Sequence, residues 1–160
     1  MRATFALVEG WTAAIRRIAL ADGEAGVTEF TLGELAMLRG ETYELEDSGE
    51  VRSKPVFQQL TRQLRFFRAF AKTYALPFTL EIGGGGWRSF KKALEIRNRI
   101  THPKQAMDLA VSDDDLEQCG RAHAWFIFQA VKLTELFTRS LRDSRPAVAD
   151  DRAGESEGSG

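Results

Sequence analysis

The segment Arg97-Asn98-Arg99-Ile100-Thr101-His102 contains two side chains that together suit chemistry at a phosphate group. A guanidinium is a planar fork with a permanent charge that matches phosphate oxygens, and imidazole is the side chain that titrates near neutral pH. We therefore interpret Arg97 as a phosphate-binding candidate and His102 as a proton-transfer candidate. Asn98 lies four residues before His102, so on a helix its amide can contact and orient the imidazole.

The residues from Trp87 to Thr101 fit one amphipathic helix, and Arg97 lies on its apolar side. At about 100° per residue, one arc contains Trp87, Phe90, Ala93, Leu94, Ile100 and Thr101, with Arg97 in its middle. A charge in that position is costly unless it is paired or meets a wet cleft or an anion. The opposite face holds what we expect to be ordinary solvated charges: Arg88, Lys91, Lys92, Glu95 and Arg99. Pro103 predicts that the helix ends at His102.

The run Arg97-Asn98, three further residues and His102 resembles the signature of HEPN domains. These are helical modules with an Arg, a polar residue, and a His four to six residues after the Arg. The resemblance covers about eight residues and the helical context. It implies a metal-independent endoribonuclease of the toxin–antitoxin, CRISPR-associated or other antiviral kind, with Arg97, Asn98 and His102 as catalytic residues. It also implies a symmetric homodimer in which two copies of the motif face each other.

The chemistry that this resemblance implies needs no metal or other cofactor. Proton transfer by His102 contributes about 10²–10⁴-fold in such a reaction, and Arg97 offsets the charge that grows on the phosphate. The expected products are a 2′,3′-cyclic phosphate and a 5′-hydroxyl, so DNA, which lacks the 2′-hydroxyl, is not a substrate. A ribonuclease in its own cytoplasm needs restraint, which makes a cognate antitoxin or a sensor protein an expected partner.

Charge is distributed unevenly along the chain, although the net charge is only −1. Residues 1–51 have a balance of −6, residues 52–104 a balance of +10, and residues 105–160 a balance of −5. Local positive charge beside a phosphate site is what a nucleic-acid ligand needs, and a solvated basic face is the alternative interpretation. The candidate RNA-binding residues in this basic third are Arg62, Arg65, Arg68, Lys72, Arg99 and Lys104.

Apolar periodicity predicts an all-α fold, an antiparallel bundle of four main helices plus the short motif helix, without strands. The main helices are expected at residues 3–22, 31–47, 53–75 and 112–142, with a capping box at Thr31, an N-cap at Ser53 and Pro55 just inside the third helix. Residues 77–86, which end in four glycines, are expected to form a flexible hinge. The predicted domain covers residues 1–143, and the acidic segment 144–160 is expected to be disordered.

The last helix carries more apolar surface than one neighbour covers, which is a second reason to expect a dimer. Its seam includes Phe126 and Leu133, and Trp125, Phe128 and Val131 add a further apolar side. Its seam also holds His123, the only other histidine, which we interpret as a core or interface residue. Three aspartates open this helix, but they diverge around it and no second ligand cluster is visible, so no metal site is predicted.

The sequence lacks an apolar run long enough to cross a membrane and has no signal-peptide pattern at its start. Its single cysteine, Cys119, suits a reducing compartment, and we expect a cytoplasmic protein. Two alternatives to the ribonuclease remain. One is a catalytically silent helical module that binds RNA or a nucleotide, and the other is a protein-binding adaptor in which an acid such as Asp113, Asp114 or Asp115 neutralises Arg97.

Overall fold

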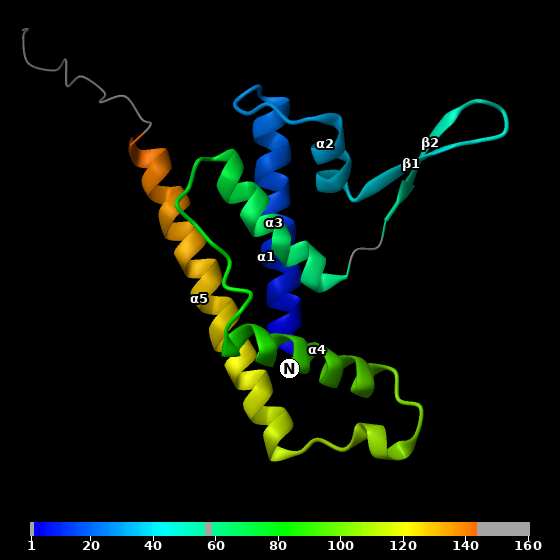
Figure 1. Ribbon diagram of the computed structural model, residues 1–160, viewed down its shortest axis with the longest axis vertical. Helices are drawn as coiled ribbons and strands as arrows, with labels where there is room; N and C mark the ends of the chain where they lie inside the picture. Colours follow the sequence, from blue (N-terminus) through cyan, green and yellow to red (C-terminus); the bar gives the residue numbers. More distant parts are fainter. Residues whose placement is uncertain (1, 57–58, 144–160) are drawn as a thin grey trace, which may run out of the picture.

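The computed structural model describes residues 2–56 and 59–143, and the predicted disordered tail at 144–160 lies outside the described residues (Figure 1). The described chain is mainly helical, as the sequence predicts. Its elements are α1 (Arg2–Glu24), α2 (Leu32–Arg39), β1 (Glu41–Leu45), β2 (Val51–Pro55), α3 (Leu60–Thr73), α4 (Gly85–Thr101), the 3₁₀ helix η1 (Ala106–Leu109) and α5 (Asp113–Asp143).

The long helix α1 runs through the middle of the molecule, with α5 on one side and α2 and the hairpin on the other, and α3 crosses α1 (Figure 1). Helix α4 runs across the lower end of this arrangement and packs mainly against α5. A chain segment that contains η1 then connects α4 to α5. This arrangement brings the C-terminal half of α4, which carries the predicted motif, beside the first turns of both α1 and α5.

The core is built largely from phenylalanine and tryptophan rings. Phe5, Phe67, Phe90 and Phe126 are at most 2% exposed. Their rings contact one another across helices, with centroids 5.9 Å apart for Phe5 and Phe90 and 6.3 Å apart for Phe67 and Phe126. Burying one such side chain contributes about 1.5–3 kcal/mol, so these rings hold α1, α3, α4 and α5 together.

The predicted second helix is wrong beyond Arg39. The capping box at its start is present, since Glu34 N–H donates to the Thr31 hydroxyl and the Glu34 carboxylate accepts the Thr31 N–H. Gly40 then adopts φ +70°, a left-handed conformation that ends the helix. The residues that follow form an antiparallel hairpin, which also corrects the expectation of no strands.

The hairpin changes the start of the third helix as well. Ser53 and Pro55 lie in β2, opposite Tyr43 and Glu41, so the predicted N-cap and first-turn proline are wrong. Helix α3 begins at Leu60, after Gln59. The β-forming residues of both strands and a turn at Gly49, whose φ is +84°, favour the hairpin over a helix in this region.

The predictions for α1, α5 and the end of α4 are confirmed within two residues. Ser112 caps α5 as expected, because its hydroxyl accepts the Asp115 N–H at 3.2 Å. Two of the four glycines in the expected hinge belong instead to the first turn of α4. A Cβ on Gly86 would lie 2.4 Å from a Trp125 ring carbon, so the missing side chain lets α4 approach α5 closely.

Candidate functional site

The predicted motif lies at the C-terminal end of α4, and His102 is the residue that ends this helix. Its φ of −130° and ψ of 60° are no longer helical, and its backbone N–H donates to the Asn98 carbonyl at 3.0 Å. Pro103 explains this ending, because proline disfavours helical geometry in the residue before it. The His102 side chain is therefore carried on a helix terminus and is exposed.

Arg97, Asn98 and His102 line one open pocket of about 850 Å³. We call it the motif pocket, and its other lining residues are Arg99, Thr101, Lys104 and Asp108. Asp108 accepts the backbone N–H groups of Lys104 and Gln105, at 2.8 and 3.2 Å, which keep the pKa of this carboxyl below its usual value. The lining thus includes three basic side chains, of which Lys104 forms no ion pair within the described residues, and one carboxylate that already accepts backbone N–H groups.

The Arg97 side chain turns toward α1. Its Nη2 lies 3.1 Å from the Oε1 of Glu9, and its guanidinium carbon lies 5.2 Å from the centre of the Phe5 ring. The side chain is 35% exposed. The expectation that this charge needs a partner agrees with the contact, but the acid is Glu9 rather than one of the three aspartates that begin α5.

Asn98 and His102 are adjacent at the pocket but do not form the predicted side-chain pair. Both are exposed. Within residues 2–56 and 59–143, no hydrogen bond joins the Asn98 amide to the imidazole of His102, and only the backbone groups of the two residues are bonded. The imidazole is therefore available to a ligand without a fixed orientation from Asn98.

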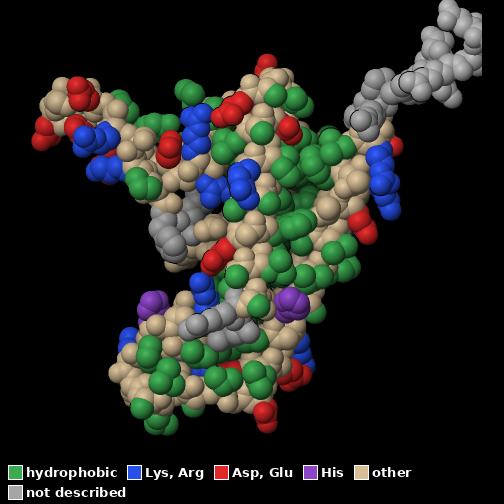
Figure 2. Space-filling view, turned by 180° about the vertical axis from the view of Figure 1, so that it is seen from behind, with side chains coloured by type: hydrophobic (Ala, Val, Ile, Leu, Met, Phe, Trp, Pro, Cys, Tyr) green, Lys and Arg blue, Asp and Glu red, His purple; other side chains and the backbone are tan. Residues whose placement is uncertain are grey.

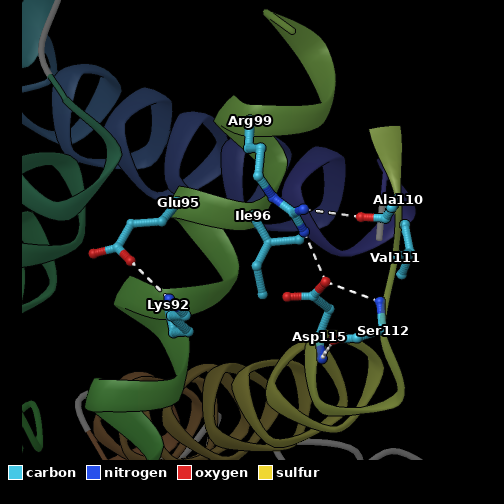
Figure 3. A pocket seen from close by; sticks show the side chains of 8 residues that line it. All are labelled: Lys92, Glu95, Ile96, Arg99, Ala110, Val111, Ser112 and Asp115. Carbon is cyan, nitrogen blue, oxygen red and sulfur yellow. Dashed lines mark hydrogen bonds and ion pairs between the residues drawn. The ribbon is translucent and has the colours of Figure 1, made fainter. Parts of the chain in front are cut away.

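Arg99, two residues after Arg97, points toward Ala110 and Asp115, at the connector and the start of α5 (Figure 3). Its Nη2 lies 2.7 Å from the Oδ2 of Asp115, and its Nη1 donates to the Ala110 carbonyl at 2.9 Å. Asp115 is only 13% exposed. The expectation that Arg99 is an ordinary solvated charge is wrong, since it connects α4 to the connector and to the start of α5.

A second open pocket, of about 640 Å³, lies beside this contact and is the one drawn in Figure 3. The Arg99–Asp115 pair forms one part of its lining. Across the pocket, Lys92 and Glu95 form an ion pair with each other at 3.5 Å. The charged groups of this pocket are paired with one another. The motif pocket also has Lys104, which forms no ion pair within the described residues, so it offers more to an anion.

The basic side chains predicted on the third helix are exposed, as expected for a stripe along its outer face. They are Arg62, Arg65, Arg68 and Lys72. In the described part of the chain, the three arginines form no ion pair. None of the four lines the motif pocket, so they form a separate basic surface on α3 rather than part of the same site.

His123 lies outside the motif pocket. It is exposed on α5, and its Nδ1 lies 3.3 Å from the Thr4 hydroxyl. The two histidine side chains of the chain are well separated on the face shown in Figure 2. The predicted seam position of His123 is therefore not a core position, but the residue remains a suitable control for His102.

The comparisons with protein-family models, with curated proteins and with solved structures find no match to this chain. The described helices include none that is both long and apolar enough to cross a membrane. Within the same residues, no group of three or more histidine, cysteine, aspartate or glutamate side chains is placed to hold a metal ion.

Sequence reasoning missed Glu9, Phe5 and Asp108. The position of Arg97 in an apolar arc indicates that some acid or anion must be near, but not which one. Phe5 and Glu9 are four residues apart on α1 and therefore share one face of that helix. This shared face is the only sequence signal for the pair, and it becomes informative only once α1 is known to pack beside α4.

Proposed function

We propose that this chain is a HEPN-like helical module that cleaves RNA without a metal ion. The observation that carries the proposal is the motif pocket, an open pocket lined by Arg97, Asn98 and His102. In-line attack on a phosphodiester needs an imidazole for proton transfer and a cation for the phosphate, and the same pocket is lined by residues of both kinds. The five described helices support a helical bundle of this kind.

In the proposed reaction, the ribose 2′-oxygen attacks the neighbouring phosphorus. The bond between this oxygen and phosphorus forms, the bond from phosphorus to the 5′-oxygen breaks, and a 2′,3′-cyclic phosphate and a 5′-hydroxyl result. His102 accepts the proton of the 2′-hydroxyl or supplies one to the leaving oxygen, and Arg97 binds the phosphate oxygens. Lys104 adds positive charge at the pocket edge, and the basic stripe on α3 guides the remaining strand.

A homodimer is part of this proposal, because one chain supplies one histidine at the site and the reaction uses two proton transfers. Exposed apolar side chains on α5, such as Phe128 at 57% and Val131 at 50%, support a second copy. Figure 2 shows apolar side chains gathered along the groove between α1 and α5. Trp125 does not belong to this surface, since it is buried against Trp87 and Phe90.

We also place the enzyme in the cytoplasm, under the control of an antitoxin or sensor protein, in a toxin or antiviral role.

The test is cleavage of a labelled single-stranded RNA in EDTA. We expect wild-type protein to give 2′,3′-cyclic phosphate ends and to leave DNA of the same sequence intact. His102→Ala should slow cleavage by about 10²–10⁴-fold, and Arg97→Ala should also slow it strongly. His123→Ala is the matched control and should cut at the wild-type rate. If His102→Ala cuts as fast as wild type, the proposal is wrong.

A catalytically silent module that binds RNA is the second candidate. Among the described residues, no hydrogen bond joins the Asn98 amide to the imidazole, so Asn98 does not orient the His102 side chain. This observation favours the binding module. Filter binding distinguishes the two functions. RNA that is retained by the wild-type protein and recovered intact, with retention lost in Arg97→Ala, selects the binding module.

A further inference from the structure

We propose that Glu9 is a positioning residue that holds Arg97 for a phosphate in the motif pocket. This inference rests on the proposed function and adds α1 to a site that the sequence places on α4 alone. The carrying geometry is the 3.1 Å contact between Glu9 Oε1 and Arg97 Nη2, together with the Phe5 ring beneath the guanidinium. Glu9 and Arg97 are 88 residues apart in the sequence.

The Glu9 contact uses one edge of the guanidinium and leaves the rest available. Arginine carries five N–H donors in a rigid fork, and the contact with Glu9 engages only Nη2. The Nε and Nη1 groups of Arg97 have no hydrogen-bond partner within the described ranges. Arg97 is among the residues that line the motif pocket, so a guanidinium held at one nitrogen keeps further N–H groups that can bind a phosphate there.

The two α1 residues that contact Arg97 are held at a fixed distance from α4. Phe5 is 2% exposed, and its ring packs against Phe90 of α4. Glu9 follows one helical turn later, on the same side of α1. The packing of the core therefore sets the place of the Glu9 carboxylate, and the carboxylate in turn sets the place of Arg97.

The energy of this ion pair indicates orientation rather than stability as its role. The side chains of Arg97 and Glu9 are 35% and 49% exposed, and exposed pairs of this kind contribute little to folding. In contrast, a displacement of about 1 Å in a catalytic or binding group can slow a reaction by about 100-fold. Loss of Glu9 should thus leave the fold intact and reduce the rate.

Glu9 also places a negative charge near the bound phosphate. Its charge therefore weakens phosphate binding, while its hydrogen bond to Arg97 favours it. Glu9→Gln keeps an oxygen that accepts the Arg97 N–H but removes the repulsion. Glu9→Ala removes both. We expect Glu9→Gln to keep kcat within about threefold of wild type and to lower KM, and Glu9→Ala to lower kcat by about tenfold or more.

The experiment measures kcat and KM for RNA cleavage by these two variants. Glu24→Ala is the matched control, since Glu24 is an exposed acid on the same helix. Thermal unfolding should show all three variants to be folded. A wild-type kcat in Glu9→Ala would overturn the proposal. An equal loss of kcat in Glu9→Gln and Glu9→Ala would also overturn it, because the charge itself would then be required.

A binding cycle separates this inference from the proposed cleavage. The probe is the single-stranded DNA form of the RNA substrate, which the proposed chemistry cannot cut. We expect Glu9→Ala to change its dissociation constant at least threefold when Arg97 is present and to have no effect in an Arg97→Ala background. Equal effects in both backgrounds overturn the inference. If wild-type protein cuts no RNA, the proposed cleavage fails, and this cycle still decides the role of Glu9.

Discussion

The two sides of α4 use their arginines in different ways. On the side toward α5, Arg99 contacts both the Asp115 carboxylate and the Ala110 carbonyl, at 2.7 and 2.9 Å. On the side toward α1, Arg97 has a single ion-pair contact, with Glu9 at 3.1 Å. The two side chains are similarly exposed, at 33% and 35%. Exposure alone therefore does not separate a structural arginine from a candidate for binding.

What separates the two arginines is how many of their donors the fold already uses. The α5 side of α4 is also packed by large rings, with the Trp87 and Phe90 centroids 5.4 and 5.3 Å from that of Trp125. Its polar groups pair as well, as in the 2.8 Å bond from Ser89 to Gln118. The α5 side thus combines ring packing with paired polar groups, whereas the α1 side combines the Phe5–Phe90 ring contact with donors of Arg97 that are left for a ligand.

The largest effect on the α5 side should come from Gly86→Ala. A Cβ there would lie 2.4 Å from a Trp125 ring carbon, so α4 and α5 must separate. We expect a loss of about 3 kcal/mol in the free energy of unfolding. Gly85→Ala is the matched control, because the nearest atom to its Cβ is 3.9 Å away. Urea denaturation measures both, and equal stability of the two variants would show that the helices do not depend on this close contact.

Substitution of Arg99 or Arg97 by alanine should have a smaller effect on stability, and the size of the change in Tm should distinguish the two arginines. Arg99→Ala removes two contacts that tie α4 to the connector and α5, and we expect Tm to fall by about 2–4 °C. Arg97→Ala removes one exposed ion pair and should leave Tm within about 1 °C of wild type. Binding of single-stranded nucleic acid should show the reverse order, with the larger loss in Arg97→Ala. A larger Tm loss in Arg97→Ala would contradict the division between the two sides.

The helices with sustained apolar periodicity could be predicted from the sequence, and the hairpin could not. Leu35, Leu38 and Leu45 have helix-like spacing, so the pattern predicted a helix that continues past Gly40. The left-handed conformation of Gly40 and the strand-forming Thr42 and Tyr43 decide the outcome. The hairpin is exposed, so apolar burial gave no additional signal for it.

The motif pocket was predictable because its three candidate residues lie within six positions at one helix end. Their shared location follows from the local chain. The partner of Arg97 was not predictable, because Glu9 reaches it only through the packing of α1 beside α4. Arg99 was misplaced for the same reason. Helical periodicity assigned it to a solvated face, but the connector and the start of α5 cover that face.

The smallest expected effect concerns pH and tests the α5 side once more. The Ser112 backbone N–H and then the Arg99 guanidinium hold the pKa of Asp115 below its usual value of 3.8. The folded state therefore binds fewer protons than the unfolded state near this pH. The contribution of Asp115 to the free energy of unfolding is thus present above pH 3.8 and is lost as the pH falls below it.

Asp115→Asn should reduce the fall in Tm between pH 6 and pH 3. Asp113→Asn removes the same charge from the same helix end without these contacts and should leave the fall larger. Equal pH dependence in the two variants would mean that Arg99 and Ser112 do not act through the Asp115 carboxylate, and the contrast between the two sides of α4 would then depend on ring packing alone.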